Sequence, residues 1–252
     1  MIIFYHSKQQ LIAIFTLFFL FLPIYCMAEN EVVLVVGAPR SGTSCVSGVL
    51  DILGVDFGGN FHATSVSQYN EKGDYEDKSF DEFSRAICRD LNLNGHKPRI
   101  IDWQNEQKKE ECKDKLKKFI KRLKKNSFGV KIPLISLLLP IYLESLQELG
   151  YVTKLLIVLR NPDEIAESWH RRWKDPKQII YATIAKYYFN LIKYSQGYDV
   201  LVIYFDDVIN NLELVVDEIN KFIPDLKSYS QAETQLIDFV DKELKHHNVF
   251  KS

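Results

Sequence analysis

The fold is decided by one stretch of the chain, Val32-Val33-Leu34-Val35-Val36-Gly37-Ala38-Pro39-Arg40-Ser41-Gly42-Thr43-Ser44. Its unbroken run of β-branched and aliphatic residues predicts a strand buried on both faces, as in a parallel sheet. The loop that follows leads into an apolar periodic segment, Val46 to Leu53, which predicts a helix. Backbone N–H groups and the positive end of a helix dipole meet in such a strand–loop–helix unit, and the loop is therefore expected to bind an anion.

The glycines of this loop have the spacing of a known nucleotide-binding motif. Gly37 and Gly42 match G-x-x-x-x-G-K-[ST], but Thr43 stands where that motif has its phosphate-binding lysine. The arrangement that hydrolyses ATP or GTP is therefore not assembled. Arg40 supplies the cation instead, and Thr43 and Ser44 place two hydroxyl groups at the start of the helix.

A second buried-strand run carries another anion-binding pattern. Lys154 to Leu159 is followed by Arg160, and Pro162 then suits the first turn of a helix with Asn161 as its N-cap. Ser168 would lie about two turns along this helix. An arginine at a strand end and a serine on the next helix can share one anionic group.

Together the two stretches resemble the sulfotransferases that use 3′-phosphoadenosine 5′-phosphosulfate (PAPS). In that family a P-R-S-G-T-[ST] loop holds the 5′-phosphosulfate and an R-[ND]-P…S segment holds the 3′-phosphate. The resemblance implies that Arg160 and Ser168 bind the 3′-phosphate. It implies that the 5′ side is bound by Pro39, Arg40, Ser41, Gly42, Thr43 and Ser44.

A third stretch carries the candidate base. Residues 70–77 resemble the N-x-x-G-[YFW]-[FYW]-E-D segment of many bacterial and Golgi-type sulfotransferases, with Asp74 in place of the first aromatic residue. In these branches the catalytic base is a glutamate near this point, which makes Glu76 the candidate. The alternative is that Glu76 and Asp77 only place negative charge at the start of a helix that runs to Leu91.

Lys131 is the candidate second cation. Ser127 to Pro133 predicts a short strand ended by proline, followed by an apolar helix from Leu134 to Leu149. Burying an ammonium group without a partner is costly, so a lysine at the end of a buried strand is expected to meet a ligand. The segment resembles the family's K-[DE]-P motif, whose lysine can lie on the transferring sulfate, with Ile132 in place of the acid. The alternative is a lysine that reaches solvent.

The first 29 residues are not expected to belong to a globular fold. Leu11 to Ile24 is almost wholly apolar, follows Lys8, and precedes small side chains near Ala28. This pattern predicts a secretory signal peptide or a short signal-anchor, with cleavage and retention both open. The basic side of the segment places the folded part outside the cytosol, in the secretory pathway or at a membrane. Such a compartment would have to import PAPS, as the Golgi lumen does.

Residues 30–252 have the length of one α/β domain. A net charge of −1 does not indicate a nucleic-acid-binding face. No cysteine or histidine spacing indicates a metal site. Outside the leader, Cys88 and Cys112 form a disulfide or remain buried thiols.

The remaining segments predict further elements. Gln104 to Asn126 is an amphipathic helix whose lysines either attract an acidic glycan or a membrane, or line a solvated face. Trp169 to Trp173 is a basic and aromatic cluster whose rings either stack on adenine or pack between helices. Residues 54–59 are predicted to close the first helix and to begin a short strand. The other predicted elements are a helix at 177–194, a strand at 199–205, and helices at 212–222 and 231–244.

These observations predict a three-layer α/β/α sandwich around a mainly parallel sheet, similar to P-loop NTPases and sulfotransferases. The resemblance implies sulfuryl transfer from PAPS to a hydroxyl or amine of a small molecule or carbohydrate, without a metal. Glu76 would be the base, and Arg40 and Lys131 the cations. If Glu76 is not the base, His62 and His170 are the next candidates. A nucleotide-loop kinase and a catalytically inactive nucleotide-binding protein of the same fold remain the alternatives.

Overall fold

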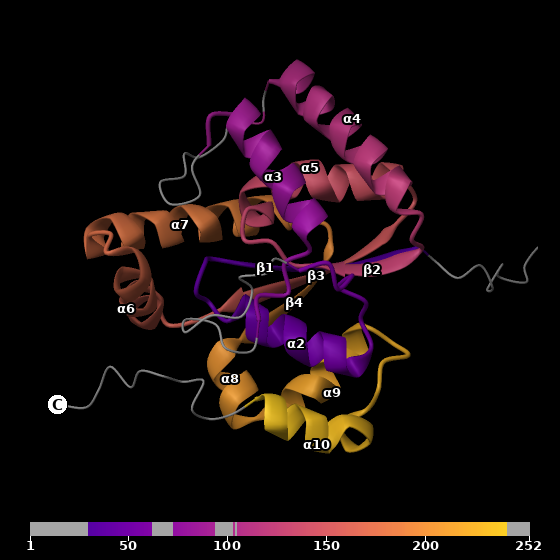
Figure 1. Ribbon diagram of the computed structural model, residues 1–252, viewed down its shortest axis with the longest axis vertical. Helices are drawn as coiled ribbons and strands as arrows, with labels where there is room; N and C mark the ends of the chain where they lie inside the picture. The colour runs from indigo at the N-terminus through magenta and orange to yellow at the C-terminus, as the bar shows by residue number, and fades with distance from the viewer. Residues whose placement is uncertain (1–29, 62–72, 94–102, 104, 241–252) are drawn as a thin grey trace, which may run out of the picture.

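The computed structural model describes residues 30–61, 73–93, 103 and 105–240. In these ranges the chain forms a four-stranded, entirely parallel sheet with the strand order β2-β1-β3-β4 (Figure 1). The strands are β1 (Glu31–Gly37), β2 (Ser127–Val130), β3 (Val152–Leu159) and β4 (Asp199–Tyr204). Among the described helices, none combines the length and the apolar character that crossing a membrane requires. The proposed leader, residues 1–29, lies outside the described residues.

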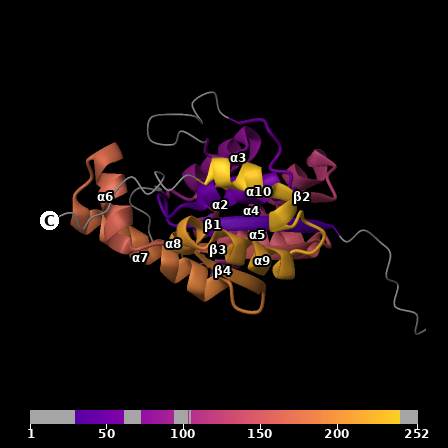
Figure 2. The same ribbon diagram turned by 90° about the horizontal axis from the view of Figure 1, so that it is seen from below.

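Helices cover both faces of this sheet, which confirms the predicted three-layer α/β architecture. One face carries α3 (Lys78–Asp90), α4 (Glu106–Leu123), α5 (Ile135–Glu148) and α7 (Lys177–Tyr194) (Figure 1). The other face carries α2 (Thr43–Leu53), α8 (Phe205–Asn210), α9 (Leu212–Phe222) and α10 (Tyr229–Phe239), and Figure 2 views the molecule from this side. Helix α6 (Pro162–Trp173) packs against α7.

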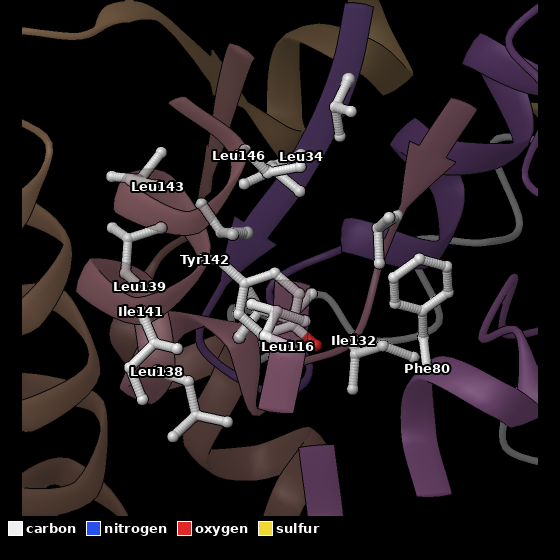
Figure 3. Packing of buried hydrophobic residues seen from close by; sticks show 14 of the residues in the cluster. Leu34, Phe80, Leu116, Ile132, Leu138, Leu139, Ile141, Tyr142, Leu143 and Leu146 are labelled. Atoms are coloured by element: carbon white, nitrogen blue, oxygen red, sulfur yellow. The ribbon is translucent and has the colours of Figure 1, made fainter. Parts of the chain in front are cut away.

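The alternation of side chains along β1 creates the two cores. Leu34 points into the core under α3, α4 and α5, where it joins Leu116 and Tyr142 (Figure 3). Val33 and Val35 point to the opposite core, under α2 and α9. Burying one aliphatic side chain of this size stabilises the fold by roughly 1.5–3 kcal/mol, so both faces of β1 contribute. This explains why the strand reads as an unbroken apolar run.

Helix α10, the last described helix, packs against α2. The ring of Phe239 lies against Gly48, and a Cβ at that position would collide with it. Phe239 also makes an edge contact with the ring of Tyr75, with 6.1 Å between the centroids. The predicted helix at 231–244 is α10, which begins at Tyr229; residues from 241 on lie outside the described residues.

The prediction that a short strand begins within residues 54–59 is wrong, although Gly54 does end α2 as its C-cap. This segment is a loop, and Gly58 and Gly59 adopt φ values of 99° and 92°, which extended strands do not allow. The Asp56 side chain accepts a hydrogen bond from the Gly58 N–H at 2.7 Å and so closes a local turn. One backbone contact reaches the sheet, from the Gly129 N–H to the Asp56 carbonyl at 2.8 Å.

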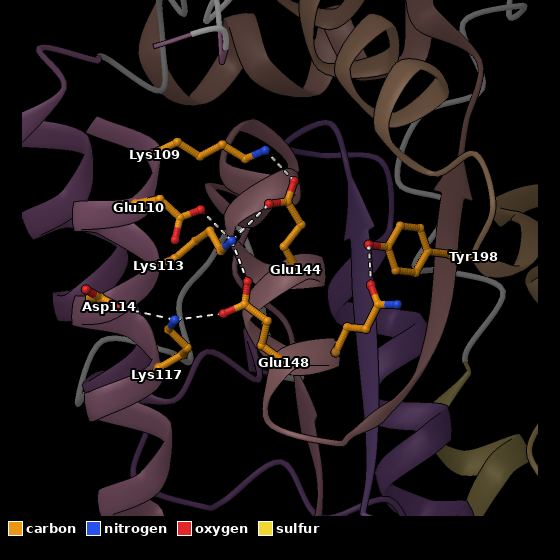
Figure 4. Close-up of polar contacts among 9 residues, drawn as sticks. Lys109, Glu110, Lys113, Asp114, Lys117, Glu144, Glu148 and Tyr198 are labelled. Atoms are coloured by element: carbon orange, nitrogen blue, oxygen red, sulfur yellow. Dashed lines mark hydrogen bonds and ion pairs between the residues drawn. The ribbon is translucent and has the colours of Figure 1, made fainter. Parts of the chain in front are cut away.

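The lysines of α4 do not all line a solvated face. Lys113 is enclosed by three carboxylates, with Nζ 2.7 Å from Glu110, 3.3 Å from Glu144 and 2.5 Å from Glu148 (Figure 4). Glu144 and Glu148 belong to α5. The charged residues of α4 therefore attach this helix to α5 beside the apolar contacts.

Among the described residues, Cys45, Cys88 and Cys112 are free thiols, and Cys88 and Cys112 do not form a disulfide. Burial raises the pKa of Cys45 and of Cys88 to about 12. Of the two alternatives for Cys88 and Cys112, the structure contains the buried thiols. They act as small apolar side chains in the core under α3 and α4.

Candidate active site

The candidate site lies at the carboxyl ends of the central strands. Gly37 at the end of β1 is paired with Val158 of β3, and Arg160 follows just beyond β3. The chain leaves β1 toward β2 at one edge of the sheet, and leaves β3 toward β4 at the other. Ligands of open α/β sheets bind in the crevice at such a switch point.

The loop after β1 requires its glycines. Gly42 has a φ of 97°, and a Cβ there would collide with the ring of Phe205 at the start of α8. The Ser41 side chain is completely buried, and its Oγ has no hydrogen-bond partner among the described residues. The N-cap residue of α2 is Gly42, which makes no side-chain capping hydrogen bond. A helix that begins without a side-chain cap presents its first N–H groups to an anion.

Arg40 joins this loop to helix α6. Its backbone is left-handed, with a φ of 71°, and its Nε donates to Ser168 Oγ at 2.9 Å. Arg160 Nη1 donates to the carbonyl oxygen of Arg40 at 3.3 Å. The loop that contains Arg40 and the segment from Arg160 to Ser168 are therefore in direct contact. Arg40, predicted as a cation at the 5′ side, thus contacts Ser168, which was predicted to bind the 3′-phosphate.

Four arginines give this side of the site a high positive charge. Burial, followed by the charges of Arg172, Arg160 and Arg171 in that order, lowers the pKa of Arg40 to about 10. Mutual repulsion among these guanidinium groups is relieved when an anion binds between them. The donor set therefore fits a phosphate group.

Arg160 already has a carboxylate partner. Its Nε is 2.9 Å from Glu164 Oε2, and the guanidinium lies over the ring of Phe205 at 4.6 Å. Both charged side chains are largely buried, with 9% of Arg160 and 13% of Glu164 exposed. A phosphate at Arg160 would share the guanidinium with Glu164, whose nearby charge opposes a second anion.

The second half of the site forms around Lys131, directly after β2. Its Nζ donates to Glu76 Oε1 at 2.8 Å, to the Asp74 carbonyl at 2.9 Å and to Ser44 Oγ at 3.1 Å. Only 3% of the Lys131 side chain is exposed. Of the two interpretations of this lysine, the structure excludes the one that reaches solvent. Three distant segments of the chain therefore meet at one ammonium group.

Glu76 and Asp77 have different positions although they are adjacent. Asp77 is the N-cap of α3, and its Oδ1 accepts from the N–H groups of Ser79 at 2.9 Å and Phe80 at 3.3 Å. This is the helix-start position considered for both acids. Glu76 instead directs its carboxylate to Lys131.

Sequence reasoning missed Ser136 in the first turn of α5. The Gly37 N–H donates to Ser136 Oγ at 3.2 Å, and the Ser136 hydroxyl donates back to the Gly37 carbonyl at 3.0 Å. This pair of bonds fixes the residue at which β1 becomes the anion loop. The two residues are 99 positions apart, and a serine in an apolar helix gives no signal of such a partner.

The sequence also suggested two histidines as alternative bases and an aromatic cluster as a candidate ligand contact. His170 is on α6 and its Nδ1 is 2.7 Å from the carbonyl oxygen of Asp175, while His62 lies outside the described residues. Trp169 is 1% exposed and makes an edge contact with Trp173, so its ring packs between helices rather than facing a ligand. Within the described ranges, no group of three or more His, Cys, Asp or Glu side chains could hold a metal ion.

No family model matches the chain, and neither does any curated protein sequence. Solved structures that resemble it include the sulfotransferase domain from the Synechococcus PCC 7002 olefin synthase, with 15% identity, coverage of 87% of this chain and 84% of that chain, and a TM-score of 0.48. Sulfotransferase STF9 from Mycobacterium avium has 12% identity, coverage of 88% and 69%, and a TM-score of 0.46. Retinol dehydratase in complex with androsterone and inactive cofactor PAP has 14% identity, coverage of 88% and 67%, and a TM-score of 0.43. At these values the function must be argued from this chain's own residues.

Proposed function

We propose that this protein transfers a sulfuryl group from PAPS to a hydroxyl or amine of a small molecule or carbohydrate. The observation that supports this most directly is the contact between Lys131 and Glu76, 2.8 Å apart, beside Ser44 at the start of the anion loop helix. A buried cation, a carboxylate and an anion-binding helix start are thus within one hydrogen-bonded group.

In this proposal the two halves of the site hold opposite ends of the donor. The loop from Pro39 to Ser44 grips the 5′-phosphosulfate with backbone N–H groups and the hydroxyls of Thr43 and Ser44. Arg160 and Ser168 bind the 3′-phosphate, assisted by Arg40, which already contacts Ser168. PAPS supplies an activated sulfuryl group whose bond to the 5′-phosphate oxygen breaks during transfer.

The catalytic roles follow from the charges. Glu76 accepts the proton of the acceptor hydroxyl or amine as the new bond to sulfur forms. Lys131 stabilises the negative charge on the sulfuryl oxygens and on the departing phosphate. The hydrogen bond from Lys131 to Glu76 fixes the base and the cation relative to each other.

The decisive experiment measures transfer from ³⁵S-labelled PAPS to a panel of alcohols, amines and glycans. We expect turnover by the wild-type protein and a loss of roughly 10²- to 10⁴-fold in Glu76→Gln, with unchanged affinity for 3′-phosphoadenosine 5′-phosphate (PAP). Glu82→Gln is the matched control, because Glu82 is an exposed acid of α3 that pairs only loosely with Lys78, at 3.9 Å.

Three results would contradict the proposal or one of its parts. Stabilisation of the protein against heat by ATP with magnesium but not by PAP would favour the kinase alternative. Tight PAP binding without transfer to any acceptor would favour a nucleotide-binding protein. Near wild-type turnover in Glu76→Gln would remove Glu76 from the base position.

The location of the reaction is a separate proposal that depends on residues 1–29. We infer that this segment directs the domain out of the cytosol as a cleaved signal or an anchor. N-terminal sequencing of the protein expressed with its leader tests this inference. An intact leader on a protein found only in the cytosol would contradict it.

A further inference from the structure

The turn before α3 contains one residue that contacts both members of the Lys131–Glu76 pair. Asp74 accepts a hydrogen bond from the Glu76 N–H through its side-chain Oδ1 at 3.1 Å. Its main-chain carbonyl accepts from Lys131 Nζ at 2.9 Å. Asp74 stands where the motif described above has an aromatic residue, and the ring of a phenylalanine or tryptophan there would offer the Glu76 N–H no acceptor.

The backbone between Asp74 and Glu76 is in an unusual conformation. Tyr75 has a φ of 55°, in the left-handed region that residues other than glycine rarely adopt. An aspartate side chain that accepts from the N–H two residues later closes such a turn locally. The Asp74 side chain therefore stabilises the same backbone conformation that places Glu76.

Contacts on both sides hold this turn in place. The Tyr75 ring makes edge contacts with Phe57, Phe61 and Phe239, at centroid distances of 6.3, 5.7 and 6.1 Å. On the other side, the Lys78 N–H donates to the Asn60 carbonyl at 2.8 Å. These contacts fix Tyr75 and Lys78 to the body of the domain. Between them, the Glu76 N–H is held by the side chain of Asp74.

We propose that Asp74 is a positioning residue, which holds the Glu76 carboxylate against the Lys131 ammonium through the Glu76 N–H. This inference rests on the proposed function, in which Glu76 is the base. The acceptor oxygen of the side chain is the required feature, whereas its negative charge is not. Without that oxygen the left-handed turn relaxes, and a displacement of the carboxylate by about 1 Å is enough to lower turnover by roughly 10²-fold.

The experiment separates the acceptor from the charge. Asp74→Ala and Asp74→Leu remove the acceptor, and we expect kcat to fall roughly 10- to 100-fold with unchanged PAP affinity. Asp74→Asn keeps an acceptor oxygen without the charge and should stay within about threefold of wild type. In a Glu76→Gln background, Asp74→Ala should cause no further loss, because it acts through Glu76.

Asp56→Ala is the matched control. Asp56 also accepts from the N–H two residues later, at Gly58, but it is exposed and its partner is Lys125 rather than Lys131. This variant should retain wild-type kcat. A kcat loss in Asp74→Asn as large as in Asp74→Ala overturns the proposal, as does unchanged kcat in both Asp74→Ala and Asp74→Leu.

A second readout does not depend on finding the acceptor. Hydrogen exchange of the Glu76 amide, followed by NMR, should accelerate at least about tenfold in Asp74→Leu and remain slow in Asp74→Asn and Asp56→Ala. Equal exchange in all variants overturns the role of Asp74. If no acceptor is ever sulfated, the proposed function fails, while the exchange data still decide whether Asp74 holds the Glu76 backbone.

Discussion

Lys113 and Lys131 are two nearly buried lysines in opposite electrostatic situations. Their side chains are 6% and 3% exposed. Lys113 has three carboxylates around its ammonium group, whereas Lys131 has one carboxylate, one carbonyl and one hydroxyl. An additional anion at Lys113 would be repelled by the excess negative charge of the three carboxylates. At Lys131 two of the three partners are neutral oxygens, so the repulsion of an additional anion would be smaller. Burial of a lysine therefore does not identify a ligand site; the balance of charge around it does.

The pKa of Lys113 shows the same balance. Burial lowers it, but the hydrogen bonds that Lys113 donates to Glu110, Glu148 and Glu144 outweigh this effect and raise its pKa above the ordinary value. The lysine stays protonated wherever the domain is folded at ordinary pH. A permanently charged group of this kind fastens α4 to α5 and takes no part in proton transfer.

Replacing Lys131 should produce the largest effect on activity. Lys131→Met should lower turnover by about 10³-fold, because a preorganised cation beside the developing charge is lost. It should weaken PAPS more than PAP, since the ammonium would lie at the sulfuryl end. Radiolabel transfer and calorimetry with the two nucleotides measure these effects. Full activity of Lys131→Met would mean that Lys131, like Lys113, serves only to hold the structure together.

Replacing Arg160 should affect binding and not chemistry. Losing a charge-assisted hydrogen-bond partner typically costs about 1.5–3 kcal/mol, so Arg160→Ala should weaken PAP at least about tenfold. Affinity for 5′-AMP, which lacks the 3′-phosphate, should hardly change. Calorimetry with both nucleotides tests this, and equal losses for the two would contradict the assignment of Arg160.

Replacing Lys113 should affect stability alone. Lys113→Met leaves three carboxylates facing one another, but each is partly exposed, so we expect a loss of only about 1–3 kcal/mol in the free energy of unfolding. Turnover per folded molecule should not change. Urea denaturation measures the loss, and Lys115→Met, which breaks the exposed pair with Asp90, is the control that should leave the midpoint nearly unchanged.

Acidification checks the cause of that loss. Hydrogen bonds from Lys113 and then Lys117 hold the pKa of Glu148 below its ordinary value. A carboxylate with a lowered pKa in the folded state contributes stability above its unfolded pKa and loses it as the pH falls through the folded value. The difference between Lys113→Met and wild type should therefore shrink in acid. A constant difference would mean that the methionine disturbs packing instead.

Features that depend on local sequence were predicted well. The strand and loop from Val32 to Ser44 and the helix at 177–194 were placed correctly, because burial on both faces and helical periodicity leave a direct pattern. The prediction of a strand beginning within 54–59 was wrong because Val55 and Phe57 belong to a loop, although their side chains pack in the core beside the sheet. Apolar side chains alone do not distinguish these two cases.

Features that depend on tertiary contacts were harder to predict. Glu76 and Lys131 were chosen separately, and their contact across 55 positions depends on the order of the strands. Lys113 cannot be distinguished in sequence from the other lysines of α4, because its burial depends on the angle at which α4 meets α5. The roles assigned to Glu76, Lys131, Arg160 and Ser168 remain predictions.

The contact of Phe239 with Gly48 and Tyr75 bears on how the protein is made. Every residue assigned to the site, from Pro39 to Ser168, emerges from the ribosome before α10 does. The helix after the anion loop and the turn that carries Glu76 gain their shared contact with Phe239 only after α10 has been synthesised. A fragment that ends before Phe239 keeps every motif residue but lacks the contact that fixes two of the motifs together.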